Sequence, residues 1–167
     1  MKTNSDRIKY LILIFCFLFP ALNILCQGTY CNNADPLCTT SISTFPAGVN
    51  QPNASNTDPG NNYGCLLSTP NPAWYYLEID QSGNLAIDIS NNGIVMGSEA
   101  DIDFAVWGPF ADINVATANC GSLTSPVDCS FSPIDHPEEL DISGVVSGQV
   151  YILLVTNYEN ISCDISL

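Results

Sequence analysis

The chain has almost no positive charge, because its three basic residues, Lys2, Arg7 and Lys9, all lie within the first nine positions. Seventeen Asp and Glu residues stand against them, which gives a formal net charge of -14. So acidic a surface repels phosphate groups, and this argues against binding to nucleic acid or to an anionic membrane surface. After Lys9 the chain also lacks a lysine for a Schiff base and an arginine that could hold an anion.

Histidine is nearly as scarce, since His136 is the only one in the chain. A serine-type catalytic triad requires a histidine, but His136 lies in an acidic loop between Asp135 and Pro137, with no nucleophile motif near it. The carboxylates are spread over expected turns and strand faces, so a glycosidase-type pair is not indicated either. We therefore expect no catalytic activity.

The first 26 residues have the pattern of a secretory signal peptide. A charged start is followed by an almost wholly apolar run from Tyr10 to Cys26, which is short for a membrane span. We predict cleavage after Cys26; a lipid-modified Cys26 is the alternative. The expected location is secreted, either extracellular or on the cell surface.

Six cysteines remain after the leader, and none of them forms a Cys-x-x-Cys pair of the kind that binds zinc. An even number in an exported chain predicts disulfides. Cys120 and Cys129 enclose a short, turn-rich segment and form the first predicted pair. The other predicted pairs are Cys38 with Cys65, which would tie the N-terminal part to itself, and Cys31 with Cys163, by elimination.

No helical periodicity follows the leader, whereas short alternating segments that predict strands are frequent. The segment 27–73 is rich in Asn, Pro, Gly and Ser, and we expect it to be irregular, stapled by disulfides and packed on the remainder. Gly108-Pro109 should end the third strand, and the apolar run 150–156 should be covered on both faces. The predicted strands are 74–80, 85–90, 101–107, 150–156 and 161–167. They indicate an all-β, jelly-roll-like antiparallel sandwich over 74–167, with 27–167 forming one domain.

Several motifs, taken in order, resemble a known type of module. They are Cys31-Asn-Asn-Ala-Asp-Pro-Leu-Cys38, Asn62-Tyr-Gly-Cys65, Pro70-Asn-Pro-Ala-Trp-Tyr-Tyr76, Asp101-Ile-Asp-Phe-Ala-Val-Trp-Gly-Pro-Phe110, Asn119-Cys-Gly121, Asp128-Cys-Ser130 and Gly148-Gln-Val-Tyr-Ile-Leu-Leu-Val-Thr-Asn157. This order resembles the N-terminal β-sandwich module of secreted Bacteroidota surface proteins of the adhesin or gliding-motility type. It is also similar to the pre-peptidase C-terminal domain of exported enzymes. The resemblance implies a sandwich fold and a role at the cell surface.

A possible calcium site lies in the acidic run Glu99, Asp101 and Asp103. In an extended chain these three carboxylates would lie on one face of a strand, and Ca²⁺ prefers oxygen ligands of this kind. The alternative is that Asp101 and Asp103 bond to nearby backbone groups while Glu99 lies in solvent.

Trp107 is the residue that we expect to contact a ligand. It belongs to a set of aromatic residues, most of which should pack in the core. By alternation Trp107 shares a strand face with Asp101 and Asp103, opposite the expected core. An exposed ring there would suit a sugar. These observations predict a non-catalytic binding or adhesion module whose partner is a polysaccharide or another surface protein. The alternatives are an accessory domain of an exported hydrolase and a structural spacer.

Overall fold

The structure is a computed structural model and describes residues 28–37, 43–133 and 137–167. The expected leader, Cys38 and His136 lie outside the described residues. The elements, in chain order, are η1 (Cys31–Asn33), β1 (Asp35–Pro36), β2 (Thr44–Pro46), α2 (Ala54–Thr57), β3 (Pro72–Glu78), β4 (Gly83–Asn91), β5 (Ile94–Val95), β6 (Ser98–Glu99), β7 (Ile102–Phe110), α3 (Ile113–Ala118), β8 (Asp128–Ser130), β9 (Glu138–Val145), β10 (Val150–Asn157) and β11 (Asp164–Ser166).

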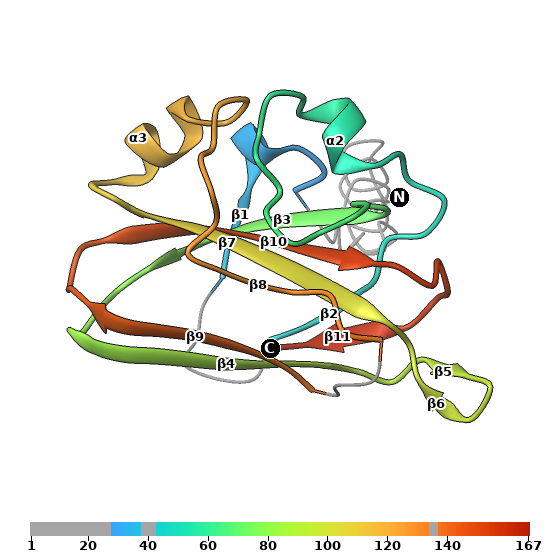
Figure 1. The fold of residues 1–167 in the computed structure, drawn as a ribbon. Helices are drawn as coiled ribbons and strands as arrows, with labels where there is room; N and C mark the ends of the chain where they lie inside the picture. Colours follow the sequence, from blue (N-terminus) through green and yellow to red (C-terminus); the bar gives the residue numbers. More distant parts are fainter. Residues whose placement is uncertain (1–27, 38–42, 134–136) are drawn as a thin grey trace, which may run out of the picture.

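The strands form a sandwich, which confirms the predicted all-β fold (Figure 1). One sheet has five strands in the order β1-β3-β10-β7-β8, and the other has four in the order β2-β11-β4-β9. All pairs within them are antiparallel except β1 with β3. The small hairpin β5-β6 stands apart from both sheets.

The main core lies between the two sheets. The five-stranded sheet contributes side chains such as Phe104 and Leu153, and the four-stranded sheet contributes Ile89, Leu140 and Ile165. All of these are almost completely buried. Phe104, Ile89 and Ile165 come from the alternating apolar positions of predicted strands, and Leu153 comes from the apolar run 150–156. Leu140 lies in β9, a strand that the sequence analysis did not predict.

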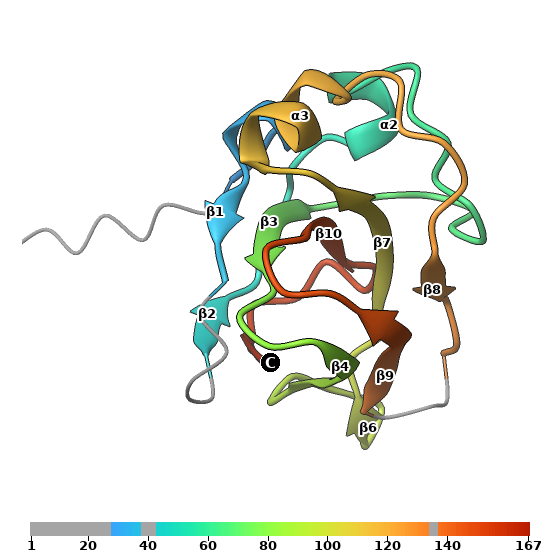
Figure 2. The ribbon, with the colours of Figure 1, turned by 90° about the vertical axis from the view of Figure 1, so that its left-hand side faces the viewer.

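A second core covers the outer face of the five-stranded sheet. Here Trp74, Trp107 and Leu154 belong to one buried cluster. Short helices and loops lie over this face of the sheet, in the upper parts of Figures 1 and 2. We call the covering segments, residues 28–34, 53–69 and 112–126, the cap. Because the sheet is covered on both sides, every residue of β10 is buried, as the apolar run 150–156 predicted.

The structure corrects the expected end of the third strand. β7 continues through Gly108-Pro109 to Phe110, and the bond before Pro109 is cis. The contacts between β7 and β8 end at Val106, so beyond that point β7 has a neighbour only on the β10 side. Proline lacks an N–H and is tolerated where one side of a strand is unpaired.

The structure also contains short helices where the sequence gave no helical signal. In α3 the carboxylate of Asp112 accepts a hydrogen bond from the N–H of Val115 at 2.9 Å, which is an ordinary N-cap. The helix has six residues, too few to display a 3.6-residue period. The capping residue was therefore the only local signal of its presence.

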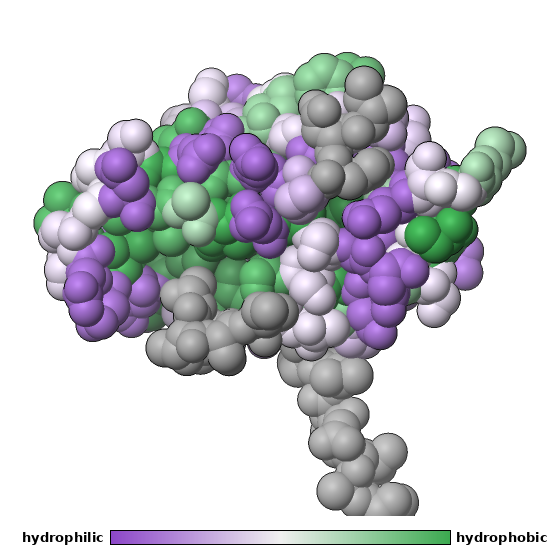
Figure 3. All heavy atoms as spheres, turned by 90° about the horizontal axis from the view of Figure 1, so that it is seen from below, coloured by the Kyte–Doolittle hydropathy of each residue, from purple (hydrophilic) through white to green (hydrophobic). Residues whose placement is uncertain are grey.

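The outer face of the four-stranded sheet forms the underside of the molecule (Figure 3). Along β4 and β9, exposed residues such as Asp88 and Asp141 alternate with buried ones such as Ile87. Hairpin β5-β6 projects at the right of this view with Ile94 exposed and Met96 completely exposed at its tip. In Figure 3 polar side chains on this face therefore alternate with apolar surface, and an apolar projection lies at its end.

Candidate functional site

Trp107 is not an exposed platform for a ligand, and that prediction was wrong. Its side chain is 1% exposed and lies beneath the cap. The indole N–H donates to the carbonyl oxygen of Thr124 at 2.9 Å and to that of Asn62 at 3.1 Å. The ring also packs against Trp74 and Tyr63, with centroid distances of 5.6 and 6.1 Å. Trp107 therefore holds the cap onto the sheet.

The disulfide pairs also differ from those predicted. Cys31 is bonded to Cys120 and Cys65 to Cys129. This contradicts all three predicted pairs, and within the described residues the buried Cys163 forms no disulfide. The first bond joins two cap segments and the second joins the cap to β8, so both tie the N-terminal part to the C-terminal half and not to itself. Both are disulfides in a small domain, which fits an oxidising compartment outside the cytoplasm.

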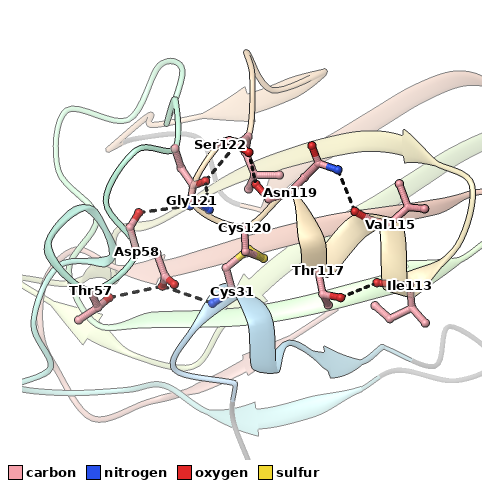
Figure 4. The surroundings of a disulfide bond; sticks show 12 residues. Cys31, Thr57, Asp58, Ile113, Val115, Thr117, Asn119, Cys120, Gly121 and Ser122 are labelled. Atoms are coloured by element: carbon pink, nitrogen blue, oxygen red, sulfur yellow. Dashed lines mark hydrogen bonds between the residues drawn. A yellow bond between two sulfur atoms is a disulfide. The ribbon is translucent and has the colours of Figure 1, made fainter.

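Figure 4 shows the first of these bonds, which joins η1 to the turn after α3. The Asp58 carboxylate beside it accepts a hydrogen bond from the backbone N–H of Cys31 at 3.3 Å. Burial raises the pKa of Asp58, and the bonds from Cys31 and Thr57 act in the opposite direction. The Asp58 carboxylate therefore bonds to the backbone of the cap beside this disulfide, and the region has a structural role.

The expected calcium ligands are not brought together as one set. Glu99 belongs to hairpin β5-β6, Asp101 precedes β7, and Asp103 lies within β7. The chain between Glu99 and Asp103 is not one continuous strand. Within the described residues no group of three or more His, Cys, Asp or Glu side chains is placed to hold a metal ion. Asp101 and Asp103 nevertheless share a hollow in the surface.

That hollow, which we call the groove, has a volume of about 290 Å³. Its lining consists of Leu67, Ser68, Asp101, Asp103, Phe131, Pro133 and Tyr158. The two carboxylic residues are 8% and 4% exposed, whereas Leu67 is 91% exposed and Phe131 and Tyr158 are each 51% exposed. The groove therefore combines buried acidic groups with a rim of exposed apolar and aromatic side chains.

The Cys65–Cys129 disulfide holds two walls of the groove side by side. Leu67 follows Cys65 by two residues, and Phe131 follows Cys129 by two residues. On the cap side the N–H of Cys65 also donates to the Cys129 sulfur at 3.2 Å. The cross-link thus fixes the spacing between segments that are 64 residues apart in the chain.

Buried amides position the third wall, Tyr158, at the end of β10. The side-chain amide of Asn157 donates to the carbonyl oxygens of Ile161 and Gly48, at 2.7 and 2.9 Å. The amide of Asn71 in turn donates to the carbonyl of Asn157 at 2.9 Å. The N–H of Tyr158 then bonds the carbonyl of Asp101 at 3.0 Å, which ties the wall to the floor.

The floor of the groove is electrostatically crowded. The pKa of Asp103 is raised from 3.8 to about 7, first by burial and then by the negative charges of Asp101 and Glu138 and a side-chain hydrogen bond with Asp101. Glu138 begins β9 and is 2% exposed. The sequence has no Lys or Arg after Lys9, so none of the described residues supplies such a cation to this floor. A carboxylic acid is stable here only if it is protonated or meets an external positive group.

Sequence reasoning found part of this site and missed its walls. Asp101 and Asp103 were identified, although as partners of Glu99 and Trp107. Leu67, Phe131 and Tyr158 come from loops far apart in the chain, and only the fold brings them together. The pair Leu66-Leu67 in a polar segment was a usable signal, because Leu66 is buried and Leu67 is exposed.

Comparison of the chain with protein-family models, with curated proteins and with solved structures found no match. The resemblance to Bacteroidota surface modules and to the pre-peptidase C-terminal domain therefore stays a prediction. Within the described residues, no helix is long and apolar enough to cross a membrane.

Proposed function

We propose that this chain is a non-catalytic binding module that acts outside the cytoplasm and contacts its partner through the groove. The observation that carries this proposal is the pairing of buried carboxylic groups with three exposed apolar walls in one hollow. Exposed apolar side chains that gather around a concave site, rather than lying scattered, are typical of binding surfaces.

Two further features support a role outside the cytoplasm. One disulfide joins two segments of the cap and another fastens the cap to β8, and disulfides persist in oxidising compartments. The acidic surface favours partners that are neutral or positively charged. A polysaccharide and a second surface protein both meet this condition, and the protein is the better match to the apolar rim.

The proposal is tested by a binding screen combined with an activity screen. The exported protein is immobilised and exposed to a panel of polysaccharides and of secreted and surface proteins, while a second sample is incubated with hydrolase substrates. Binding should weaken by about tenfold or more in the double variant Phe131→Ser, Tyr158→Ser, because both rings are half exposed on the rim.

The matched control is the double variant Ile94→Ser, Met96→Ser, which removes exposed apolar side chains from hairpin β5-β6 instead. It should leave binding unchanged. Reproducible turnover of a substrate, binding that the groove variant does not affect, or no binding to any member of the panel would each overturn the proposal. The last result would leave a structural spacer as the better account.

A further inference from the structure

Two buried oxygen atoms, one in the floor of the groove and one beside it on β10, lack hydrogen-bond partners in the described part of the chain. They are Oδ1 of Asp103 and Oγ1 of Thr156, which belong to residues 4% and 0% exposed. The two residues are paired across β7 and β10, so their side chains lie on the same face of the five-stranded sheet. A buried polar group without a partner destabilises the fold, so such groups often mark a place for a missing ligand.

The missing partner must be a hydrogen-bond donor and should be positively charged. Asp103 Oδ1 can only accept when the group is ionised, and Asp101 and Glu138 add negative charge nearby. Both of these neighbours make interactions of their own, and Asp103 has a side-chain hydrogen bond with Asp101, so the unpartnered atom in the groove is Asp103 Oδ1. No Lys or Arg follows Lys9 in the sequence and the only histidine lies outside the described residues, so the described part of the chain supplies no positive side chain here, and we look for one on another molecule.

An organic cation fits the groove better than a metal ion. Ca²⁺ takes about six to eight oxygen ligands. Within the described residues, no group of three acidic, His or Cys side chains is placed to supply them. The walls are instead Leu67, Phe131 and Tyr158. Such walls suit a cation that has an apolar stem and a flat face that can stack on an aromatic ring.

The guanidinium group of arginine has these properties. It is planar, carries five donors, stacks on aromatic faces and is less strongly hydrated than an ammonium group. It can therefore donate to Asp103 in the floor of the groove while its stem lies against the walls. The volume of about 290 Å³ is at the small end for ligand sites and matches one side chain rather than a polymer. The almost fully exposed Leu67 at the rim would then contact the surface that carries that side chain.

We propose that the groove receives an arginine side chain of a partner protein, with the guanidinium group bonded to Asp103 and the stem held between Leu67, Phe131 and Tyr158. This inference rests on the proposed binding function and specifies the chemistry of the partner. The buried acidic floor gives specificity for a cation, and the apolar rim provides the contact area around it.

The test uses N-acetyl-arginine amide as the probe and follows the amide signals of the isotope-labelled exported protein by NMR. Two control probes separate charge from shape: the citrulline analogue has the same shape without charge, and the lysine analogue has charge without the planar fork. Shifts should gather near Leu67, Asp103 and Tyr158. The arginine probe should bind about tenfold more tightly than the citrulline analogue, and also more tightly than the lysine analogue.

Variants then assign the binding to the floor of the groove. Asp103→Asn should weaken binding of the arginine probe by about tenfold or more, because it removes the ionised acceptor. Asp88→Asn removes an exposed carboxylate from β4 and should leave the affinity unchanged. Equal affinity for the arginine and citrulline probes, shifts elsewhere on the protein, or an unchanged affinity in Asp103→Asn would each overturn the inference.

A calcium titration of the same sample tests whether the groove binds Ca²⁺ instead of a guanidinium group. Saturable shifts of the groove signals by Ca²⁺, without an effect of the arginine probe, would also overturn the inference. If the partner found in the binding screen is sensitive to Phe131→Ser, Tyr158→Ser but is not displaced by the arginine probe, the ligand class is wrong and the binding function stands. If the groove variants have no effect on that partner, the binding function itself fails.

Discussion

Removal of the Cys65–Cys129 disulfide should both destabilise the fold and weaken the groove. This bond links residues that are 64 positions apart, and the Cys31–Cys120 bond links residues 89 apart. On the loop-closure model, breaking either bond costs about 4 to 5 kcal/mol of the free energy of unfolding. Small domains have about 5 to 15 kcal/mol in total, so each loss should be large.

The two double variants, Cys65→Ala, Cys129→Ala and Cys31→Ala, Cys120→Ala, form a matched pair. Urea unfolding should show a similar loss of stability in both. Only the first pair of substitutions frees Leu67 from Phe131, so only that variant should bind the arginine probe more weakly while still folded. Cys163→Ala, which removes a buried cysteine outside both observed bonds, is the control for cysteine removal as such.

Peptide mapping checks the connectivity on which this reasoning depends. Trypsin cannot be used beyond Lys9 because the remaining chain has no Lys or Arg, so a protease that cuts after Glu or aromatic residues is required. We expect linked peptides for the two observed bonds and an alkylated Cys163 under denaturing conditions. A loss of stability under about 1 kcal/mol in both double variants, or equal probe binding in the two, would refute the reasoning.

Three further predictions concern single residues. The free energy of unfolding of Asp103→Asn should exceed that of the wild type by an amount that grows as the pH rises from 3.8 to about 7. In that pH range the folded wild type keeps a proton on Asp103 that the unfolded chain loses, so the wild type loses stability as the pH rises and the variant does not. At about 1.4 kcal/mol per pH unit the advantage of the variant is at most about 4 kcal/mol, and solvent screening reduces it to about 2 kcal/mol. Urea unfolding along a pH series measures this difference. Trp107→Phe removes the indole N–H that donates to the carbonyl oxygens of Asn62 and Thr124. It should lower the free energy of unfolding by about 2 kcal/mol, and an unchanged melting temperature would contradict this. Gly108→Ala should lower the melting temperature as well, because the added Cβ would lie 2.6 Å from a Tyr151 ring carbon at a φ of +147°, whereas Gly83→Ala meets open space.

The strands were predictable from the sequence because they alternate, and alternation is a local property. Residues 74–80 and 85–90 correspond closely to β3 and β4. The predicted strand 161–167 shortened to β11 because side-chain amides, such as that of Asn157 bonded to Ile161, take the place of ladder bonds before it.

Alternation indicates that a strand has two faces but does not tell which of them is covered. Trp107 was placed on an exposed face for this reason. The run 150–156 had already predicted a strand buried on both sides, and its neighbour β7 shares that environment. The outer face of β7 therefore had to be covered too. The cap itself could not be predicted, since its helices are too short to show a period and its disulfides join distant segments.

The groove could not be predicted from the sequence either, because most of its residues are far apart in the chain. Its acidic floor comes from one strand and could be seen as a pattern in the sequence. Its walls come from three separate loops, which meet only because a disulfide and buried amides bring them to the same sheet edge. Only the carboxylates of the site had a local signature.

The most direct measurement of the central claim is the ionisation of Asp103 in the purified, disulfide-bonded protein, followed by NMR of its carboxyl carbon with and without N-acetyl-arginine amide. The account predicts a pKa of about 7 for this group in the free protein. It also predicts a signal that is missing in Asp103→Asn and a pKa that falls when the probe is added, because a bound guanidinium group favours the charged carboxylate. An Asp103 pKa near the ordinary value of 3.8 in the free protein, or a raised pKa that the probe does not change, would contradict it.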